Sequence, residues 1–161
     1  MDESVAERLI ALLKTKGASF EVLHHEPVRT SAEAALVRGT TMEQGAKALV
    51  FQADDRMLLL VLPANLRVDT RAFKRALGVK NLRMIDAGAL LEHFGLEVGA
   101  VPPFGHLFGL VTYLDEGLLS QPQIAFNAGS RSMSVLLATP DYVRLEKPIT
   151  GRFAEAPVMP V

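Results

Sequence analysis

The sequence predicts an α/β protein in which helices pack around a mixed β-sheet. Two observations support this prediction: helix-capping patterns recur along the chain, and two apolar segments near its middle have the length and spacing of a buried hairpin. Because helices and hairpins alternate irregularly, a doubly wound parallel sheet fits poorly. With 161 residues, of which 49% are hydrophobic, the chain is expected to form a single domain, 1–161.

The first third of the chain predicts a helix, a strand and a second helix. Each helix opens on capping-box spacing, a hydroxyl side chain followed three residues later by Glu, and each is followed by a glycine. The strand between them is favoured by Phe20 and Val22. In order, the expected elements are a helix between Ser4 and Gly17, a strand from Ser19 to His25, and a helix between Thr30 and Gly39.

The middle of the chain predicts a buried hairpin and two short helices. Apolar residues dominate 46–52 and 57–62, and the polar segment between them has the length of a hairpin turn, so we expect this hairpin at the centre of the sheet. The following elements are expected to be a helix between Asp69 and Gly78 with Ala76 facing inward, a strand over 81–85, and a helix between Asp86 and Gly95 with Leu91 facing inward.

The last third predicts three strands and one helix. The strands are expected at 106–114, 123–127 and 131–137, the last two joined by a turn at 127–130. Thr139 and Pro140 have the pattern of an N-cap and a first-turn proline, opening a helix through Leu145. Segment 146–161 contains three prolines and is expected to be an extended C-terminal tail.

Composition excludes several classes of function. The formal net charge is -1, so the whole chain has no electrostatic attraction to nucleic acid or an anionic membrane, and any RNA contact must be local. The absence of cysteine rules out a disulfide framework and a cysteine nucleophile. The longest apolar run, 57–62, is far shorter than the ~20 residues that span a bilayer. We therefore expect a cytoplasmic protein without membrane contact.

Lys47 is the charged residue that the expected fold explains least. On the first hairpin strand it shares a face with Leu49 and Phe51, and neither face of this strand looks solvated. Such a lysine either extends its ammonium group to solvent at the end of the sheet or stays desolvated beside an anionic or carbonyl partner. Gly45 favours the second alternative, because it would leave room for a ligand.

The segment from Gly95 to Gly105 combines three glycines with the adjacent Pro102 and Pro103. Glycine permits close approach or positive φ and proline stiffens the backbone, so this segment can present amide groups to a ligand. The alternative is a stiff connection between a helix and a strand. His106 follows directly and can reach a ligand there, although an isolated histidine at the start of a strand is more often a surface or packing residue.

The turn at Gly129, Ser130 and Arg131 is a second candidate for binding, because it can place amides, a hydroxyl and a guanidinium beside a bound group. No conventional catalytic centre accompanies these residues. The four histidines lack metal-ligand spacing, and no serine has a recognisable base and orienting acid. We expect neither a metal nor a cofactor.

Residues 67–83 are locally basic, with six lysines or arginines against one acidic residue. Arg71, Lys74 and Arg75 fall on one face of the expected helix. This face is either an ordinary solvated surface or a contact for a phosphate backbone. No aromatic residues are interleaved with the charges, so base stacking is not indicated.

Three of these features occur in the order and spacing of a known family. They are Lys47 within Gly-Ala-Lys-Ala-Leu-Val-Phe, the Gly-Leu-Glu-Val-Gly-Ala-Val-Pro-Pro-Phe-Gly loop, and the hairpin 127–131 leading to Ala-Thr-Pro-Asp-Tyr at 138–142. The chain resembles the YbaK/ProX aminoacyl-tRNA editing domains, relatives of the insertion domain of bacterial prolyl-tRNA synthetase. The likeness extends from about Gly17 to Leu145.

The resemblance implies a sheet curled toward a barrel and a metal-independent deacylase that hydrolyses mischarged aminoacyl-tRNA in trans. The implied substrate is tRNA for proline carrying alanine, cysteine or serine, and prolyl-tRNA synthetase is an implied partner. An ester needs less activation than an amide, so backbone amides, a positive charge and a positioned water or ribose hydroxyl can suffice. The alternatives are a non-catalytic protein that binds nucleic acid or a synthetase, and a small-molecule esterase.

The resemblance also assigns site residues. Lys47 matches the family's functional lysine, and Gly99 matches the loop that lies against the ester, so both are expected to be catalytic. Pro102 departs from the Ser-Pro of the best-known members, so no hydroxyl is expected there. Expected substrate-binding residues are Pro102, Phe104, Gly105, His106, Gly129 and Ser130, and expected tRNA-binding residues are Arg71, Lys74 and Arg75.

Overall fold

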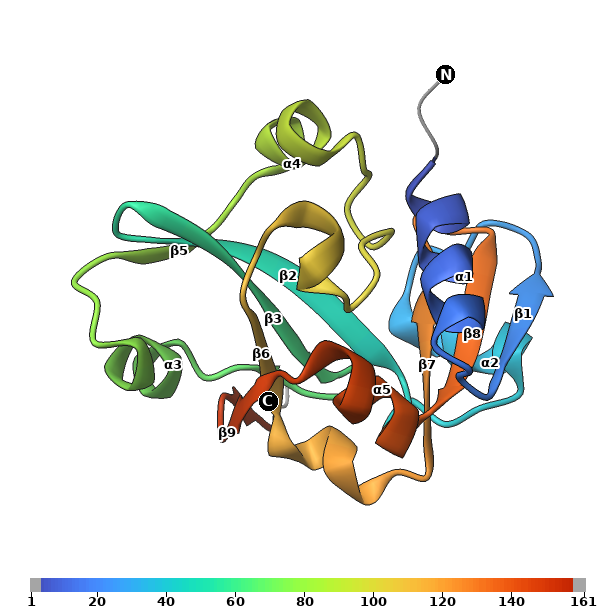
Figure 1. The fold of residues 1–161 in the computed structure, drawn as a ribbon. Coiled ribbons are helices and arrows are strands. Elements are labelled where there is room, and N and C mark those ends of the chain that lie inside the picture. The colour runs from blue at the N-terminus through green and yellow to red at the C-terminus, as the bar shows by residue number, and fades with distance from the viewer. Residues whose placement is uncertain (1–3, 158–161) are drawn as a thin grey trace.

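The computed structural model describes residues 4–157 and confirms a mixed α/β fold with helices around curled sheets (Figure 1). The helices are α1 (Val5–Thr15), α2 (Ser31–Arg38), α3 (Thr70–Leu77), α4 (Ala87–Phe94) and α5 (Thr139–Glu146), with the 3-10 helices η1 (Gly105–Phe108) and η2 (Glu116–Ser120). The strands are β1 (Phe20–His24), β2 (Ala46–Ala53), β3 (Arg56–Pro63), β4 (Arg67–Val68), β5 (Leu82–Met84), β6 (Thr112–Asp115), β7 (Gln123–Asn127), β8 (Met133–Ala138), β9 (Ile149–Gly151) and β10 (Ala154–Glu155).

The predicted hairpin lies inside the larger sheet. This sheet has the order β5-β2-β3-β6-β9, and β2 pairs with β3 in antiparallel register from Ala46 opposite Pro63. Strand β6 runs parallel to β3, which makes the sheet mixed. A three-stranded sheet, β1-β8-β7, joins it where Gly45 bridges Ala125, and the Ala125 amide donates to the Gln44 carbonyl at 2.9 Å. The two sheets therefore curl around a shared interior.

Two apolar clusters lie on the two faces of β2. Ala46, Ala48 and Val50 belong to the larger cluster, together with buried residues of α1, β7 and β8. Leu49 and Phe51 belong to the smaller cluster, which includes aromatic residues of α3 and of the C-terminal segment. Neither face of this strand is solvated, as its alternation predicts.

Helix boundaries follow the predicted caps. The side chains of Ser4, Thr30, Asp69 and Asp86 each accept a hydrogen bond from the backbone amide three residues later. Three of these helices end at a glycine in the left-handed region. Side-chain caps and glycine stops are local interactions, so the sequence suffices to place them.

Several details of the prediction are wrong. Ala76 and Leu91 are exposed, because α3 and α4 each bury a narrower stripe than expected. Segment 106–114 is not one strand: Gly109 takes a φ of 70° after η1, and only the residues from Thr112 onward enter the sheet. Thr139 is the first residue of α5 instead of its cap, and its hydroxyl has no hydrogen-bond partner among the described residues.

The C-terminal segment is integrated into the sheets. Strand β9 pairs in parallel with β6, and β10 pairs with β4. Phe153 between them is buried, with its ring centroid 5.0 Å from that of Phe73. This aromatic contact explains why the segment does not lie free on the surface. Residues 158–161 of the expected tail lie outside the described residues. Within 4–157, no helix is long and apolar enough to cross a membrane.

Candidate functional site

A pocket of about 220 Å³, here called the Lys47 pocket, opens between α2, the start of β2 and the loop before Pro102. It is closed on a further side by the end of β7 and the turn that follows. Its main polar and backbone contributors are Arg29, Ser31, Arg38, Lys47, Gly99, Asn127 and Arg131. Segments far apart in the sequence thus converge on one small cavity.

Lys47 is half-buried in this pocket and does not extend its ammonium group freely into solvent. Its Nζ donates to the carbonyl oxygen of Leu66 at 2.5 Å, and desolvation by burial lowers its pKa. The space beside Gly45 is filled by the chain itself: a Cβ there would lie 2.9 Å from that of Ala64. Gly45 therefore permits close chain packing, which corrects the expectation that it leaves room for a ligand.

Arg38 is a functional candidate that sequence reasoning missed. Its Nε donates to Ser134 Oγ and its Nη2 to Asn127 Oδ1, each at 2.9 Å. Both acceptors are uncharged, and burial lowers the pKa of Arg38 to about 10. The available signal was position: Arg38 lies four residues after the buried Ala34, on the inward stripe of an alanine-rich helix.

A hydrogen-bond network connects Arg38 to the Gly-Pro loop. Ser134 Oγ, fully buried on β8, also lies 2.8 Å from His25 Nε2. Asn127 Nδ2 donates to the carbonyl oxygen of Gly99 at 2.7 Å, so one side chain links the arginine and the loop. No sequence signal indicates that His25 contacts Ser134, because the two residues are 109 positions apart along the chain.

The Lys47 pocket is strongly cationic. Arg29, Arg38, Lys47 and Arg131 line it, and no aspartate or glutamate belongs to its lining. Two carboxylates lie next to this lining: Glu97 pairs with Arg131 at 2.9 Å, and Glu33 accepts from the backbone amide of Arg29 at 2.9 Å. Cations held together in a partly desolvated cavity favour an anionic ligand, because an anion offsets both their mutual repulsion and their lost hydration.

The structure brings Gly99 to the pocket and Gly129 to its border. Gly99 has a φ of 87° and Gly129 a φ of 90°, a region that favours glycine. The Gly129 amide donates to the Ala100 carbonyl oxygen at 2.9 Å, which ties the loop to the later hairpin. Gly129 and Ser130 line an adjoining pocket of about 340 Å³, here called the Ser130 pocket.

Four other expected substrate-binding residues do not line the Lys47 pocket. Pro102 and Phe104 are buried, and the Phe104 ring packs against Phe126 and Tyr142 with centroids 5.9 and 5.1 Å away. A Cβ on Gly105 would lie 2.4 Å from Thr112 Oγ1, so this glycine permits a tight internal turn. His106 is directed to Glu146. Pro102, Phe104 and Gly105 are therefore buried in the core, whereas His106 is exposed.

The partner of His106 is a buried carboxylate at the end of α5. His106 Nδ1 lies 2.7 Å from Glu146 Oε1, and Thr112 Oγ1 donates to Glu146 Oε2 at 2.5 Å. Burial raises the pKa of Glu146 and outweighs the opposing influence of these two hydrogen bonds. Nearby, the Tyr142 hydroxyl donates to the Pro103 carbonyl oxygen at 2.7 Å. Helix α5 thus secures the downstream end of the Gly-Pro loop.

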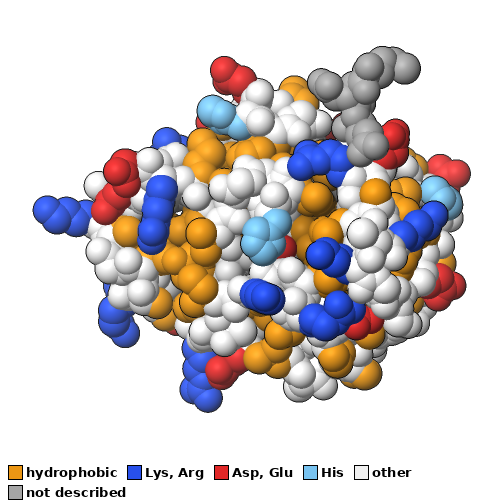
Figure 2. All heavy atoms as spheres, in the orientation of Figure 1, with side chains coloured by type: hydrophobic (Ala, Val, Ile, Leu, Met, Phe, Trp, Pro, Cys, Tyr) orange, Lys and Arg blue, Asp and Glu red, His pale blue; other side chains and the backbone are white. Residues whose placement is uncertain are grey.

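Arg71, Lys74 and Arg75 form an exposed basic face on α3. Within 4–157 they make no ion pair. Helix α3 lies on the left of Figure 1 and α2 on the right, so this face is separate from the Lys47 pocket. Figure 2 shows Lys and Arg side chains on this left side, with acidic and apolar side chains among them, and further Lys and Arg side chains on the right.

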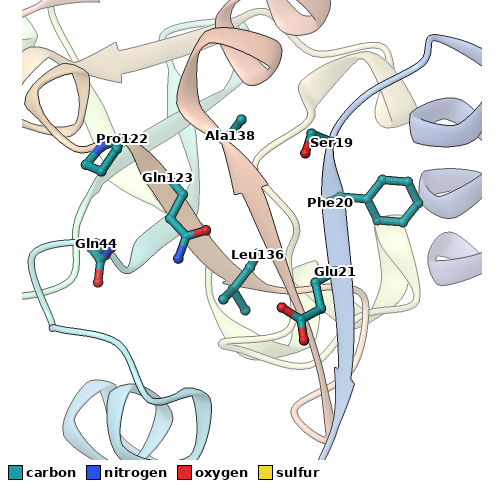
Figure 3. Close-up of a pocket in the computed structure, with 8 residues that line it drawn as sticks. All are labelled: Ser19, Phe20, Glu21, Gln44, Pro122, Gln123, Leu136 and Ala138. Carbon is teal, nitrogen blue, oxygen red and sulfur yellow. The ribbon is translucent and has the colours of Figure 1, made fainter.

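A third hollow, of about 450 Å³, differs from the Lys47 pocket in charge. It lies over the three-stranded sheet, with side chains of β1, β7 and β8 beside Gln44 (Figure 3). Glu21 is its one charged lining residue. Because no lysine or arginine lines this hollow, it offers no positive charge that would attract a phosphate. Across the residues that the structure describes, no group of three or more His, Cys, Asp or Glu side chains is placed to hold a metal ion.

Comparison with known proteins gives a consistent result. The family model described as "Aminoacyl-tRNA editing domain" matches residues 25–145. The "Multifunctional Ser/Thr-tRNA deacylase ProXp-y" of Escherichia coli (strain K12) is 35% identical over 147 residues, covering 88% of each protein. The "Proline--tRNA ligase" of Thermosipho melanesiensis is 31% identical over 85 residues, covering 53% of this chain and 15% of the ligase.

A solved structure supports the same fold. It is described as "Crystal structure of a putative trans-editing enzyme for prolyl tRNA synthetase" and superimposes with a TM-score of 0.84 at 27% identity. The match covers 97% of this chain and 100% of the other. The likeness therefore includes both sheets and the helices around them.

Proposed function

Because the chain belongs to the aminoacyl-tRNA editing domain family and is an aminoacyl-tRNA deacylase, we propose that it removes a small amino acid, serine foremost, from mischarged tRNA for proline. Membership of this family argues against the non-catalytic alternative that the sequence left open. Experiment must test two parts of this proposal, which are the substrate and the residues of the site.

The observation that supports this site most strongly is the excess of positive charge in its lining. Four cationic side chains without a lining carboxylate suit the terminal phosphate of a tRNA. The Lys47 pocket, at about 220 Å³, is smaller than the ~300–1,000 Å³ of pockets for drug-sized ligands, so it suits an aminoacyl group better than a whole nucleotide. Size exclusion would then reject a larger correct amino acid.

The chemistry needs no protein nucleophile. In this proposal the Lys47 ammonium group binds the terminal phosphate of the tRNA. The loop at Gly99 supplies backbone groups that face the ester carbonyl. A water, positioned by the protein or by the ribose hydroxyl, attacks the carbonyl carbon. The ester C–O bond breaks, the tRNA oxygen leaves with a proton from that water, and the free amino acid is released. Asn127 fixes the loop for this step by its hydrogen bond to the Gly99 carbonyl oxygen.

Three similar proteins support the choice of amino acid and of tRNA. Serine is common to the amino acids implied by the sequence and to the name of the Escherichia coli relative, a Ser/Thr-tRNA deacylase. The similarity to a proline–tRNA ligase and to a trans-editing enzyme described for prolyl tRNA synthetase supports tRNA for proline and that synthetase as a partner. The exposed face of Arg71, Lys74 and Arg75 is proposed to contact the tRNA backbone outside the pocket.

The test is a deacylation assay over tRNAs carrying serine, alanine, cysteine or threonine, on tRNA for proline and on other tRNAs. We expect the fastest turnover on seryl-tRNA for proline and no detectable turnover by Lys47→Ala. Lys14→Ala, on the exposed face of α1, is the matched control and should retain full activity. Charge reversal at Arg71, Lys74 and Arg75 should raise KM without changing kcat.

Three results would contradict parts of the proposal. Equal activity of Lys47→Ala and the parent protein would remove Lys47 from the reaction. Turnover restricted to threonyl-tRNA, or to tRNAs other than that for proline, would replace the proposed substrate while leaving the deacylase activity intact. Hydrolysis of free amino acid esters at the same rate as aminoacyl-tRNA would favour a small-molecule esterase.

A further inference from the structure

A short chain of hydrogen bonds leads from His25 to Arg38. His25 directly follows β1, is partly buried and does not line the Lys47 pocket. Its Nε2 lies 2.8 Å from Ser134 Oγ, and its Nδ1 lies 2.8 Å from the carbonyl oxygen of Glu26. The same Ser134 oxygen, which is fully buried, accepts from Arg38 Nε at 2.9 Å. One hydroxyl therefore connects His25 to a side chain of the pocket.

The partners of these groups determine where the protons lie. The Glu26 carbonyl oxygen can only accept, so His25 Nδ1 must carry a hydrogen. Arg38 Nε can only donate, so it uses a lone pair of Ser134 Oγ. In the neutral imidazole Nε2 is then an acceptor, and the single Ser134 proton is donated to it. A neutral His25 thus satisfies all of these groups at once.

A protonated His25 would disrupt this arrangement. Its Nε2 would become a second donor to Ser134 Oγ, and the Ser134 proton would have to turn toward Asn127 Oδ1. That oxygen is 3.4 Å away, beyond the range of about 2.5–3.0 Å for a hydroxyl donor, and it already accepts from Arg38 Nη2. Because Asn127 also donates to the Gly99 carbonyl oxygen at 2.7 Å, the disturbance would reach the loop.

Electrostatics act in the same direction. An imidazolium at His25 would add a positive charge beside Arg38, whose two acceptors are uncharged. Other titratable or charged side chains on the segments around His25 are Glu21, His24, Glu26, Arg29, Glu33 and Arg131. Within residues 4–157, none of these six side chains hydrogen-bonds to the His25 ring or to the Ser134 hydroxyl. The expected pH effect is therefore assigned to His25 acting on Arg38.

We propose that His25 is a positioning residue for deacylation, whose neutral ring holds the Ser134 hydroxyl as the acceptor that orients Arg38 in the Lys47 pocket. Protonation of the ring releases Arg38 and lowers the rate. This inference rests on the proposed function of the Lys47 pocket. Because histidine is the side chain that ordinarily changes charge between about pH 5 and about pH 8, activity should fall in mild acid.

The test compares pH profiles of the parent protein and His25→Gln, which keeps a neutral acceptor for Ser134 but cannot be protonated. The substrate is whichever aminoacyl-tRNA the parent hydrolyses fastest, and each protein is normalised to its own rate near pH 8. Between about pH 8 and about pH 5 the parent should lose about tenfold more activity than the variant, the effect typical of one hydrogen bond to a charged group.

The comparison cancels every pH effect that the two proteins share, including those of the ester and of Lys47. His24→Gln, at the exposed neighbouring position, is the matched control and should keep the parental profile. Equal relative declines of the parent and His25→Gln overturn the proposal. A purely structural role would lower the folded fraction of His25→Gln and leave the shape of the profile unchanged.

NMR of the imidazole nitrogens gives a readout that does not depend on activity. In the parent protein we expect His25 to carry its proton on Nδ1 near pH 8 and to gain the second on Nε2 over the interval in which the rate falls. A proton on Nε2 of the neutral ring, or a second protonation outside that interval, overturns the proposal.

The outcomes separate His25 from the proposed function. If Lys47→Ala is inactive and His25→Gln declines with pH as the parent does, the proposed site stands and the role of His25 fails. If seryl-tRNA for proline is not the preferred substrate, the proposed substrate fails. The His25 comparison is then unaffected, because it uses the preferred substrate.

Discussion

Arg38 is a partly buried and Glu146 a fully buried ionisable residue, and the two differ in the partners that the fold gives them. Arg38 donates to two uncharged oxygens, those of Ser134 and Asn127. Glu146 lies 2.7 Å from His106 Nδ1 and accepts from the Thr112 hydroxyl. The carboxylate has its partners inside the protein, whereas the guanidinium has hydrogen bonds but no counter-charge.

This difference indicates which of the two clusters is built for a ligand. A buried ion without a partner of opposite charge costs stability, so its retention is explained when a ligand supplies the charge. A buried ion whose partners are internal needs no such explanation. We therefore propose that the Arg38 end of the Gly-Pro loop is the functional end and that the Glu146 end anchors the loop to α5.

The largest expected effect comes from breaking the anchored end. Glu146→Ala leaves the Thr112 hydroxyl and the His106 ring without their shared partner and opens space in the core. We expect a loss of about 2–4 kcal/mol in the free energy of unfolding, measured by urea denaturation. Deacylation per folded molecule should remain near that of the parent. A large loss of kcat at unchanged stability would show that Glu146 belongs to the reaction.

The next largest effect is expected at the functional end, where a substitution should lower activity and leave stability nearly unchanged. Arg38→Met keeps the length and apolar stem of the side chain but removes its charge, so we expect deacylation to fall about 10-fold to 100-fold. The free energy of unfolding should change by less than about 1 kcal/mol, because relief of the desolvation of Arg38 offsets the loss of its two hydrogen bonds and Ser134 Oγ keeps His25 as a partner. Destabilisation as large as that of Glu146→Ala would contradict the comparison.

The smallest effect is a pH dependence of stability whose sign differs between the two ends. Because the pKa of Glu146 is raised above its usual 4.5, the folded state holds this proton more tightly than the unfolded state. Its contribution to stability is therefore present below pH 4.5 and is lost as the pH rises through the raised value. Unfolding free energies of the parent and Glu146→Gln, measured across this interval, should differ in slope.

A steeper decline of the Glu146→Gln variant with rising pH would contradict the raised pKa. Lys47 provides the reverse case: burial lowers its pKa, so its contribution makes stability rise with pH over the interval just below 10.5. The opposite signs follow from one cause, since desolvation favours the neutral form of both groups.

Local signals predicted most of the fold correctly. The capping side chains and glycine stops of α1 to α4 and the hairpin of β2 and β3 depend on residues close in sequence. The errors lie where distant contacts decide. Phe153 draws the C-terminal segment into the sheets by packing on Phe73, and Gly109 divides a segment that reads as one strand.

The candidate site shows the same division. Lys47 stood out in the sequence because a lysine in an apolar strand needs a special environment, and Gly99 because glycine permits an unusual backbone. Arg38 gave no comparable signal, since an arginine near the end of a short helix usually lies in solvent. Its burial became evident only when β7 and β8 supplied Asn127 and Ser134 as partners.

The sequence by itself determined the class of fold, the boundaries of most helices and the three motifs, around Lys47, Gly99 and Gly129, on which the family resemblance rests. Those features depend on periodicity, caps and backbone freedom, which are properties of short segments. Only the tertiary structure decided that Phe104 packs in the core, that Arg38 shares the pocket with Lys47, and that Arg131 borders two pockets. Such assignments depend on which distant segments meet, and the curl of the two sheets fixes that.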